Sequence, residues 1–190
     1  MKHTQLDLET LGVEPGRIIL SIGACVFDPL RAHADPVDEK FYCNISRASC
    51  EDYGLTADPN TEAWWETQSD EAKMALMSDQ QPLDRALLLL FDWWKAVGAT
   101  HVWCNGANFD VVLVEAAIRA VTAPKMEPGE KFIYPWEYYA VRCTRTILAQ
   151  AGLKSKDFMV GAAHNALNDA MAQSRAIVAA FKKLNLKTVG

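Results

Sequence analysis

Apolar residues along the chain follow two different spacings, one typical of strands and one typical of helices. Residues 17–28 form a largely apolar run that ends in Asp28-Pro29, which predicts a buried strand closed by a turn. Phe41, Cys43 and Ile45 alternate with polar residues and predict a second strand over 39–45. Residues 101–104 form a third, short strand candidate before Asn105-Gly106.

Three later segments have helical spacing instead. Apolar residues recur every three or four positions over 83–97, 109–120 and 165–184, and Gly98 follows the first of these as a C-cap. Residues 122–136 are rich in Pro, Lys and Glu and predict a surface loop. Strands that lead into alternating strands and helices indicate an α/β layered domain with a mixed sheet flanked by helices. We expect residues 1–190 to form a single domain.

Composition narrows the classes of function. Half of the 190 residues are hydrophobic, 23% are charged, and the net charge is −5, which is unlike a protein that coats duplex DNA non-specifically. The apolar run at 86–91 is far shorter than the ~20 residues of a membrane span, and no secretory signal precedes it. Five scattered cysteines without a C-x-x-C pair predict reduced thiols and a cytoplasmic location.

Candidate chemistry begins near the N-terminus, with Asp7 and Glu9 two positions apart. On a strand, side chains at i and i+2 point to the same face, about 6–7 Å apart. Two carboxylates at that spacing repel each other unless a cation lies between them, so the pair fits a divalent metal site. Taken alone, two exposed acids on an edge strand are the simpler interpretation.

Two further acidic positions lie far along the chain. Asp110 falls at the start of the predicted 109–120 helix, where a carboxylate could also serve only as a helix-capping acid. His164 and Asp169 converge if His164 precedes the last helix and Asp169 lies in its first turns, with Asn165 as N-cap. A surface histidine is the alternative for His164.

Together these motifs resemble those of the DnaQ-like DEDDh 3′–5′ exonucleases. The pattern D-x-E, N-x-x-x-F-D and H-x-x-x-x-D is present in order as Asp7 to Glu9, Asn105 to Asp110, and His164 to Asp169. The sequence around Asp7 resembles that of the phage and bacterial branch of this family, which has exonuclease VIII-like and mycobacterial exoribonuclease-like members. Family members usually have apolar residues before the first Asp, whereas this chain has His3, Thr4 and Gln5.

The resemblance implies a ribonuclease H-like fold and a two-metal phosphodiester hydrolase. Asp7, Glu9, Asp110 and Asp169 would hold two Mg²⁺ or Mn²⁺ ions, and His164 would take the proton from the attacking water. The substrate would be a single-stranded 3′ end or a short oligonucleotide, DNA or RNA, and the product a 5′-mononucleotide. No membrane partner is expected, and the oligomeric state is left open, with a homodimer among the options.

Candidate substrate contacts are less specific. The resemblance places Thr10 and Leu11 beside the terminal nucleotide, and Asn105 and Phe109 belong to the middle motif. Trp64 and Trp65 are adjacent, so on a helix one of them is expected to pack in the core while the other is free to stack on a base.

Two arginines are further candidates for contact with the substrate, and two alternative functions remain open. Arg142 and Arg145 would lie on one helical face, where they could meet a phosphate or form exposed salt bridges. The rival functions are an oligoribonuclease-type enzyme with the same chemistry and a catalytically silent module that binds nucleic-acid ends.

Overall fold

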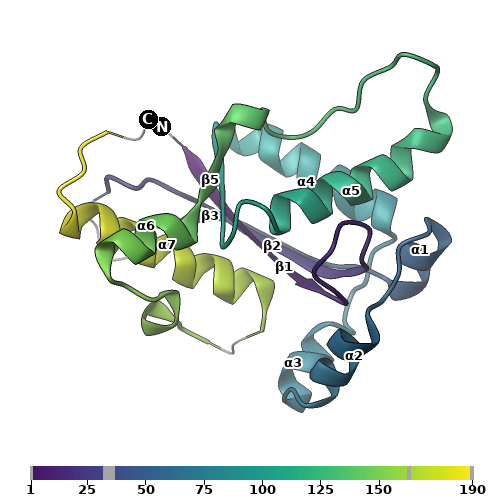
Figure 1. Cartoon of the computed structure of the whole chain (residues 1–190), viewed down its shortest axis with the longest axis horizontal. Coiled ribbons are helices and arrows are strands. Elements are labelled where there is room, and N and C mark those ends of the chain that lie inside the picture. The colour runs from purple at the N-terminus through teal and green to yellow at the C-terminus, as the bar shows by residue number, and fades with distance from the viewer. Residues whose placement is uncertain (1, 32–36, 162–163, 189–190) are drawn as a thin grey trace.

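A five-stranded mixed sheet forms the centre of the protein (Figure 1). The computed structural model describes residues 2–31, 37–161 and 164–188. The strand order is β3-β2-β1-β4-β5, in which β1 pairs antiparallel with β2 and parallel with β4. The remaining pairs are β2–β3, antiparallel, and β4–β5, parallel. The strands are β1 His3–Thr10, β2 Ile19–Phe27, β3 Val37–Asn44, β4 His101–Cys104 and β5 Val141–Cys143.

Helices connect and cover the strands. The α-helices in the described part of the chain are α1 Arg47–Asp52, α2 Pro59–Glu66, α3 Asp70–Ala75, α4 Leu83–Val97, α5 Asp110–Thr122, α6 Thr144–Ala151 and α7 Ala166–Lys183. Short 3₁₀ turns lie at Ala123–Lys125 (η1), Tyr138–Ala140 (η2) and Ser155–Phe158 (η3). The strands and helices predicted from apolar spacing are therefore present, and Gly98 ends α4 with a φ of 64°, in the left-handed region.

The two faces of the sheet bury different groups. Leu6 and Leu8 of β1 join the large apolar core formed with α4 and α5. The alternate residues of β1 face α7, which packs on β1 and β2 and is backed by α6 (Figure 1). Because side chains alternate along a strand, β1 presents apolar residues to one helix layer and polar residues to the other.

The polar start of β1 is part of the strand and is fully buried. His3, Thr4 and Gln5 each have no exposed surface. Trp103 Nε1 donates a 2.9 Å hydrogen bond to His3 Nδ1, and the Thr4 hydroxyl donates to the His101 carbonyl at 3.1 Å. These hydrogen bonds offset part of the cost of burying polar side chains, while His3 Nε2 has no hydrogen-bond partner among the described residues.

A glycine in β2 lets α7 approach the sheet closely. Gly23 pairs with Asp7 in the β1–β2 register. A Cβ atom at Gly23 would lie 2.2 Å from the Ala166 carbonyl carbon and the Leu167 nitrogen, so no larger residue fits without moving α7. The first turn of α7 therefore lies directly over the acidic part of β1.

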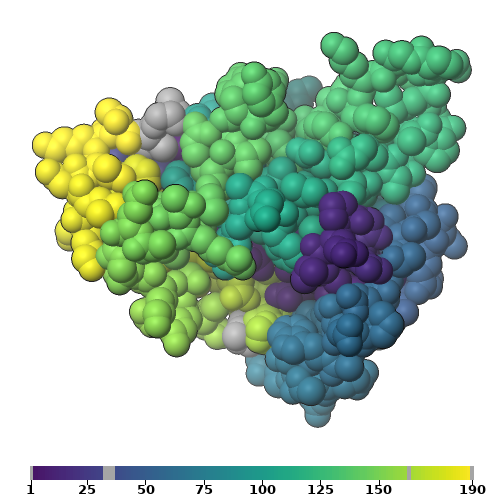
Figure 2. All heavy atoms as spheres, viewed as in Figure 1, coloured from purple at the N-terminus to yellow at the C-terminus, as the bar shows by residue number. Residues whose placement is uncertain are grey.

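The segment after β1 forms a surface loop beside α2 (Figure 2). Leu11 N–H donates to the Ile18 carbonyl at 2.9 Å, and Asp58 N–H donates to the Leu11 carbonyl at 2.7 Å. Because Asp58 caps the N-terminus of α2, these bonds fix α2 next to the carboxyl end of β1.

The expected helical pairing of Arg142 and Arg145 is wrong. Arg142 lies in β5, and α6 begins only at Thr144. Pairing of β5 with β4 extends the sheet through Cys143, which keeps Arg142 in an extended conformation and off the face of α6.

Candidate active site

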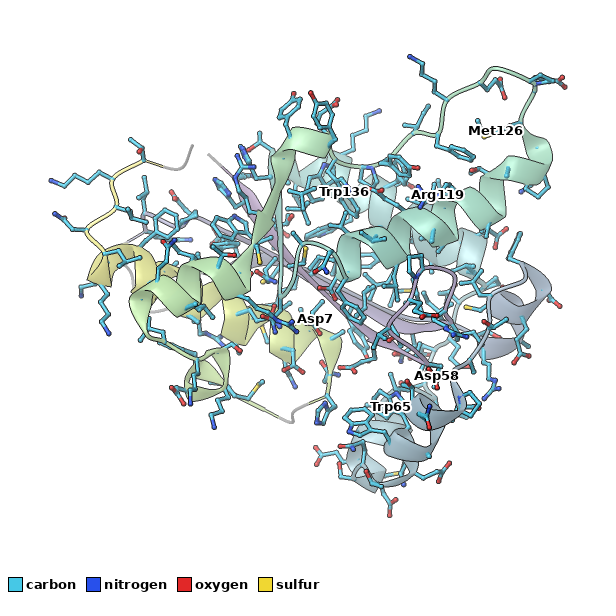
Figure 3. All side chains as sticks on the ribbon, in the orientation of Figure 1. Asp7, Asp58, Trp65, Arg119, Met126 and Trp136 are labelled. Atoms are coloured by element: carbon cyan, nitrogen blue, oxygen red, sulfur yellow. The ribbon has the colours of Figure 1, made fainter. Side chains whose placement is uncertain are left out.

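Three carboxylates from the two ends of the chain meet above β1. Asp7 and Glu9 extend from the same face of β1, as their spacing predicts, and Asp169 comes from the first turn of α7. One oxygen from each carboxylate can be chosen so that all three lie within 4.8 Å of one another. Figure 3 shows Asp7 near the middle of the molecule, close to α7. The sequence separation between Glu9 and Asp169 is closed by the packing of α7 on β1 and β2.

Asp110 is the fourth acid of the site. It is the first residue of α5 and is 1% exposed. Because β1 and β4 run parallel, their carboxyl ends lie at the same edge of the sheet, and the turn after β4 delivers Asp110 there. We refer to Asp7, Glu9, Asp110 and Asp169 as the carboxylate cluster.

Burial and mutual repulsion disfavour the ionised forms of the cluster. Burial, followed by the charges of Asp169 and Asp110, raises the pKa of Glu9 from 4.5 to about 8. Burial raises the pKa of Asp110 to about 7, although backbone N–H groups and Arg145 oppose the shift. The pKa of Asp7 is raised well above its ordinary value by burial and by the other three acids. Burial also raises the pKa of Asp169, against the opposing effect of His164. Either protonation or a bound cation would relieve this repulsion.

The cluster has the donor set of a divalent cation site. Its ligands are all carboxylate oxygens, which hard cations such as Mg²⁺ and Mn²⁺ prefer. Asp110 Oδ2 and Asp169 Oδ2 are buried and have no hydrogen-bond partner in the described part of the protein. Buried acceptors are normally satisfied, so these two oxygens fit the role of metal ligands.

A buried polar relay supports Asp7 from behind. Gln173 Nε2 donates a 2.7 Å hydrogen bond to Asp7 Oδ1, and Gln5 Nε2 donates to Gln173 Oε1 at 2.5 Å. The Thr144 hydroxyl donates to Gln5 Oε1 at 2.8 Å. Gln173 and Thr144 belong to none of the motifs that point to the site in the sequence. The alternation of Gln5 with Asp7 and Glu9 on β1 is the one sequence feature that indicates a polar face there.

His164 lies just before α7, as predicted. Asn165 caps the helix by accepting a 3.1 Å hydrogen bond from Asn168 N–H. His164 has a φ of 59°, a left-handed conformation that non-glycine residues seldom adopt. Its position directly before α7 brings it to the end of the helix that carries Asp169.

Two tryptophan rings contact the His164 ring edge-on. The centroid distances are 5.0 Å to Trp64 and 6.5 Å to Trp65. Trp65, labelled in Figure 3, is 6% exposed and donates a 2.9 Å hydrogen bond from Nε1 to the Thr10 carbonyl. Trp64 is 43% exposed. One ring is thus part of the core and the other is available at the surface beside the site, as the adjacency of the two predicts.

The remaining candidate contacts are less exposed than a substrate-binding side chain usually is. The Thr10 hydroxyl donates to the Gly12 carbonyl at 2.7 Å, and Leu11 is buried in the core. Phe109 packs partly buried against the same core. Asn105 is half-buried and lines a pocket beside α6.

The cysteines and the apolar segments are two further features of the chain. Cys25, Cys43, Cys50 and Cys104 are buried free thiols, and Cys143 is a half-buried one. Among the described residues, no helix combines the length and apolar character needed to cross a membrane.

Comparison with known proteins places this arrangement in a family. A family model described as the Rv2179c-like 3′–5′ exoribonuclease domain matches residues 2–181. Among solved structures, cell-death related nuclease 4 (CRN-4) is similar, with a TM-score of 0.55 and 9% sequence identity over 95% of this chain. The chain spans 64% of the length of that nuclease, and this likeness shows the fold alone. No curated protein sequence matches significantly.

These matches agree with what the motifs and the sheet indicate. The mixed sheet with helices on both faces is the predicted ribonuclease H-like fold, which the structural neighbour shares. The family description confirms the predicted resemblance to 3′–5′ exonucleases of the DnaQ-like superfamily. Since the family model covers nearly the whole sequence, the chain belongs to the Rv2179c-like 3′–5′ exoribonuclease domain family.

Proposed function

We propose that this protein is a divalent-metal-dependent exonuclease that removes 5′-mononucleotides from single-stranded 3′ ends. The observation that carries the proposal is the meeting of Asp7, Glu9 and Asp169 oxygens within 4.8 Å, with the buried Asp110 at the same edge of the sheet. Asp7, Glu9, Asp110 and Asp169 would hold two Mg²⁺ or Mn²⁺ ions. When bound, these ions would supply charge neutralisation and Lewis acidity at a phosphodiester.

His164 is proposed as the general base. It directly precedes α7, whose first turn carries Asp169, and a neutral imidazole at this position would accept a proton from water. The contact with Trp64 and the Asn165 cap hold the ring near the cluster.

Trp64 is proposed as the platform for the terminal base. Its exposed ring lies next to His164, and a stacked base contributes about 1–3 kcal/mol to single-strand binding. Trp65 supports that surface from the core. Thr10 and Leu11 would line the site beside the terminal nucleotide, because they directly follow Glu9 along the chain. Asn105 and Phe109 would position the strand beside Asp110.

RNA is the favoured substrate because the family that matches is described as exoribonucleases. Single-stranded DNA with the same phosphodiester chemistry is the alternative. We also propose that residues 1–190 act as one exonuclease domain, in the cytoplasm, where the free thiols would stay reduced. A homodimer is compatible with this function.

The test is digestion of matched 5′-labelled single-stranded RNA and DNA with Mg²⁺ or Mn²⁺. A ladder that shortens from the 3′ end and releases nucleoside 5′-monophosphates is expected, faster on RNA. Asp7→Asn, which is nearly isosteric, should abolish cleavage while keeping the fold. Tight binding of ends without metal-dependent release of mononucleotides would identify a silent binding module instead.

A further inference from the structure

A pocket rich in positive charge lies beside the carboxylate cluster and is not used by the chemistry above. It has a volume of about 370 Å³. Its polar lining comes from Arg145 in the first turn of α6, from Lys154, Ser155 and Lys156 at η3, and from Asn105 after β4. No acidic side chain lines it. We call this set the basic pocket.

The cations of the basic pocket form no ion pair within the part of the chain that the structure describes. Arg145, Lys154 and Lys156 are exposed. Among the described residues, the ion pairs involve other cations: Arg17, Arg31, Arg47, Lys73 and Arg119. Three cations that line one hollow and form no ion pair among the described residues, in a chain with net charge −5, indicate a site for a polyanion.

Arg145 connects the basic pocket to the carboxylate cluster. Its guanidinium carbon lies 3.7 Å from the position that a Cβ would occupy at Gly106, in the turn between β4 and α5. Its charge also acts on Asp110, the first residue of α5. The basic pocket therefore adjoins the turn that carries Asp110 of the carboxylate cluster.

The neighbouring Arg142 differs from Arg145 because its guanidinium is hydrogen-bonded to backbone carbonyls. Arg142 donates to the Tyr139 carbonyl at 2.6 Å and to the Val141 carbonyl at 3.1 Å, so it is engaged in holding the backbone before α6. The guanidinium of Arg145 keeps its planar set of donors for a ligand, which suits bidentate phosphate binding.

We propose that the basic pocket binds the sugar–phosphate backbone of the nucleic-acid strand on the 5′ side of the nucleotide held at the carboxylate cluster. Arg145, Lys154 and Lys156 contact phosphates, and Leu148 and Leu153 form an apolar wall for the sugars. In the orientation of Figures 1 and 3, Asp7 lies between α6 on one side and Trp65 on the other. The strand thus runs from α6 across the cluster toward α2. This inference rests on the proposed function.

The experiment compares a substrate that reaches the basic pocket with one that does not. The first is a single-stranded oligonucleotide, and the second is the p-nitrophenyl ester of a nucleoside 5′-phosphate, which has one phosphodiester and no upstream strand. The variants are Arg145→Ala and the pair Lys154→Ala with Lys156→Ala. Lys131→Ala, an exposed lysine outside the basic pocket, is the matched control.

The ratio of kcat/KM on the oligonucleotide to that on the ester should fall about tenfold in the double lysine variant. The salt dependence of oligonucleotide KM should become less steep by about 0.7 in log–log slope for each removed cation. A neutral methylphosphonate placed at the contacted linkage should slow the wild-type enzyme and leave the variants nearly unaffected. Arg145→Lys should restore part of the ratio, because it keeps the charge but not the planar fork.

Two outcomes would overturn the proposal. One is an equal loss on both substrates, which would mean that these residues support the cluster or the fold. The other is a loss in Lys131→Ala as large as in the pocket variants, which would mean a general charge effect. If the wild-type protein cleaves neither substrate, the proposed function fails. Fluorescence anisotropy of oligonucleotide binding, with the same variants and salt series, then still tests whether the basic pocket binds the strand.

Discussion

Gln173, in the second turn of α7, donates a 2.7 Å hydrogen bond to Oδ1 of Asp7 on β1. This hydrogen bond lowers the pKa of Asp7 and so opposes the effect of burial. It occupies only one carboxylate oxygen and leaves the other for a ligand. Gln5 fixes Gln173 in turn by donating to its Oε1. The side chain that anchors Asp7 is therefore locked from both ends by groups within the protein interior.

Gln173→Met should lower kcat by about 10–100-fold and destabilise the fold by about 1–3 kcal/mol, because it removes the donor to Asp7 Oδ1 and one of the two acceptors of Gln5 Nε2. Kinetics measured well below the melting temperature separate the two effects. Ser174→Ala, next in α7, is the control: its hydroxyl bonds the Ala170 carbonyl and should matter for stability only. Wild-type kcat in Gln173→Met would show that Asp7 needs no support.

Gly23→Ala should displace the first turn of α7 and with it Asp169 and His164. The added Cβ would meet backbone atoms of Ala166 and Leu167 at 2.2 Å, which a side-chain rotation cannot relieve. We expect a loss of metal affinity and of activity, together with about 1–3 kcal/mol of stability. Ala24→Gly alters the same strand on the opposite face and should keep metal affinity. Calorimetric metal titration of both variants is the measurement.

The stability of the metal-free protein should fall between about pH 7 and about pH 8. Asp110 and Glu9 have folded-state pKa values of about 7 and about 8, above their unfolded values of 3.8 and 4.5. The folded protein therefore binds more protons than the unfolded chain in this window, and stability is lost as they dissociate, by at most about 1.4 kcal/mol per pH unit for each carboxyl. His3, whose pKa is lowered to about 4, contributes only below this window.

Urea unfolding in EDTA at several pH values checks this expectation. Excess Mn²⁺ should remove the decline, because the cation binds the deprotonated carboxylates of the folded state. Glu9→Gln should flatten the EDTA profile. A metal-free protein that gains stability from pH 7 to 8 would contradict the cluster electrostatics.

His164→Asn should reduce kcat by about 10²–10⁴-fold with metal affinity nearly unchanged. Asn is the better replacement because it tolerates the left-handed backbone found at His164, whereas Ala adds strain. Activity and metal titrations are compared with those of Asp169→Asn, which should lose both. Weakened metal binding in His164→Asn would indicate direct ligation by the imidazole, and full activity would remove His164 from the mechanism.

Trp64→Ala and Trp65→Ala should separate stacking from packing. Trp64→Ala is expected to raise the KM for oligonucleotides with little change in melting temperature, since the ring is 43% exposed. Trp65→Ala should instead cost about 3–5 kcal/mol of stability, because it empties a core position and removes the bond to the Thr10 carbonyl. Thermal unfolding and steady-state kinetics of both variants suffice. The stacking role fails if Trp64→Ala leaves KM unchanged.

Local patterns were enough to predict much of this protein. Apolar spacing and end residues located α4 with its Gly98 cap and α7 with its Asn165 cap, because helix formation depends on neighbours within a few residues. The order of the three acidic motifs indicated the family, since each motif keeps its residues within a short segment. The spacing of Asp7 and Glu9 fixed their common face once β1 formed.

Tertiary structure alone decided the rest, because the interactions join residues that no local pattern links. Gln173 reaches Asp7 across 166 positions, and Gly23 matters only because α7 packs on it. Burial of Trp65 and exposure of Trp64 follow from how α2 docks against the end of β1. The sequence of two adjacent tryptophans does not show which of them is buried. Likewise, sheet pairing took Arg142 out of the helix, and packing of α6 beside the β4–α5 turn brought Arg145 to the cluster.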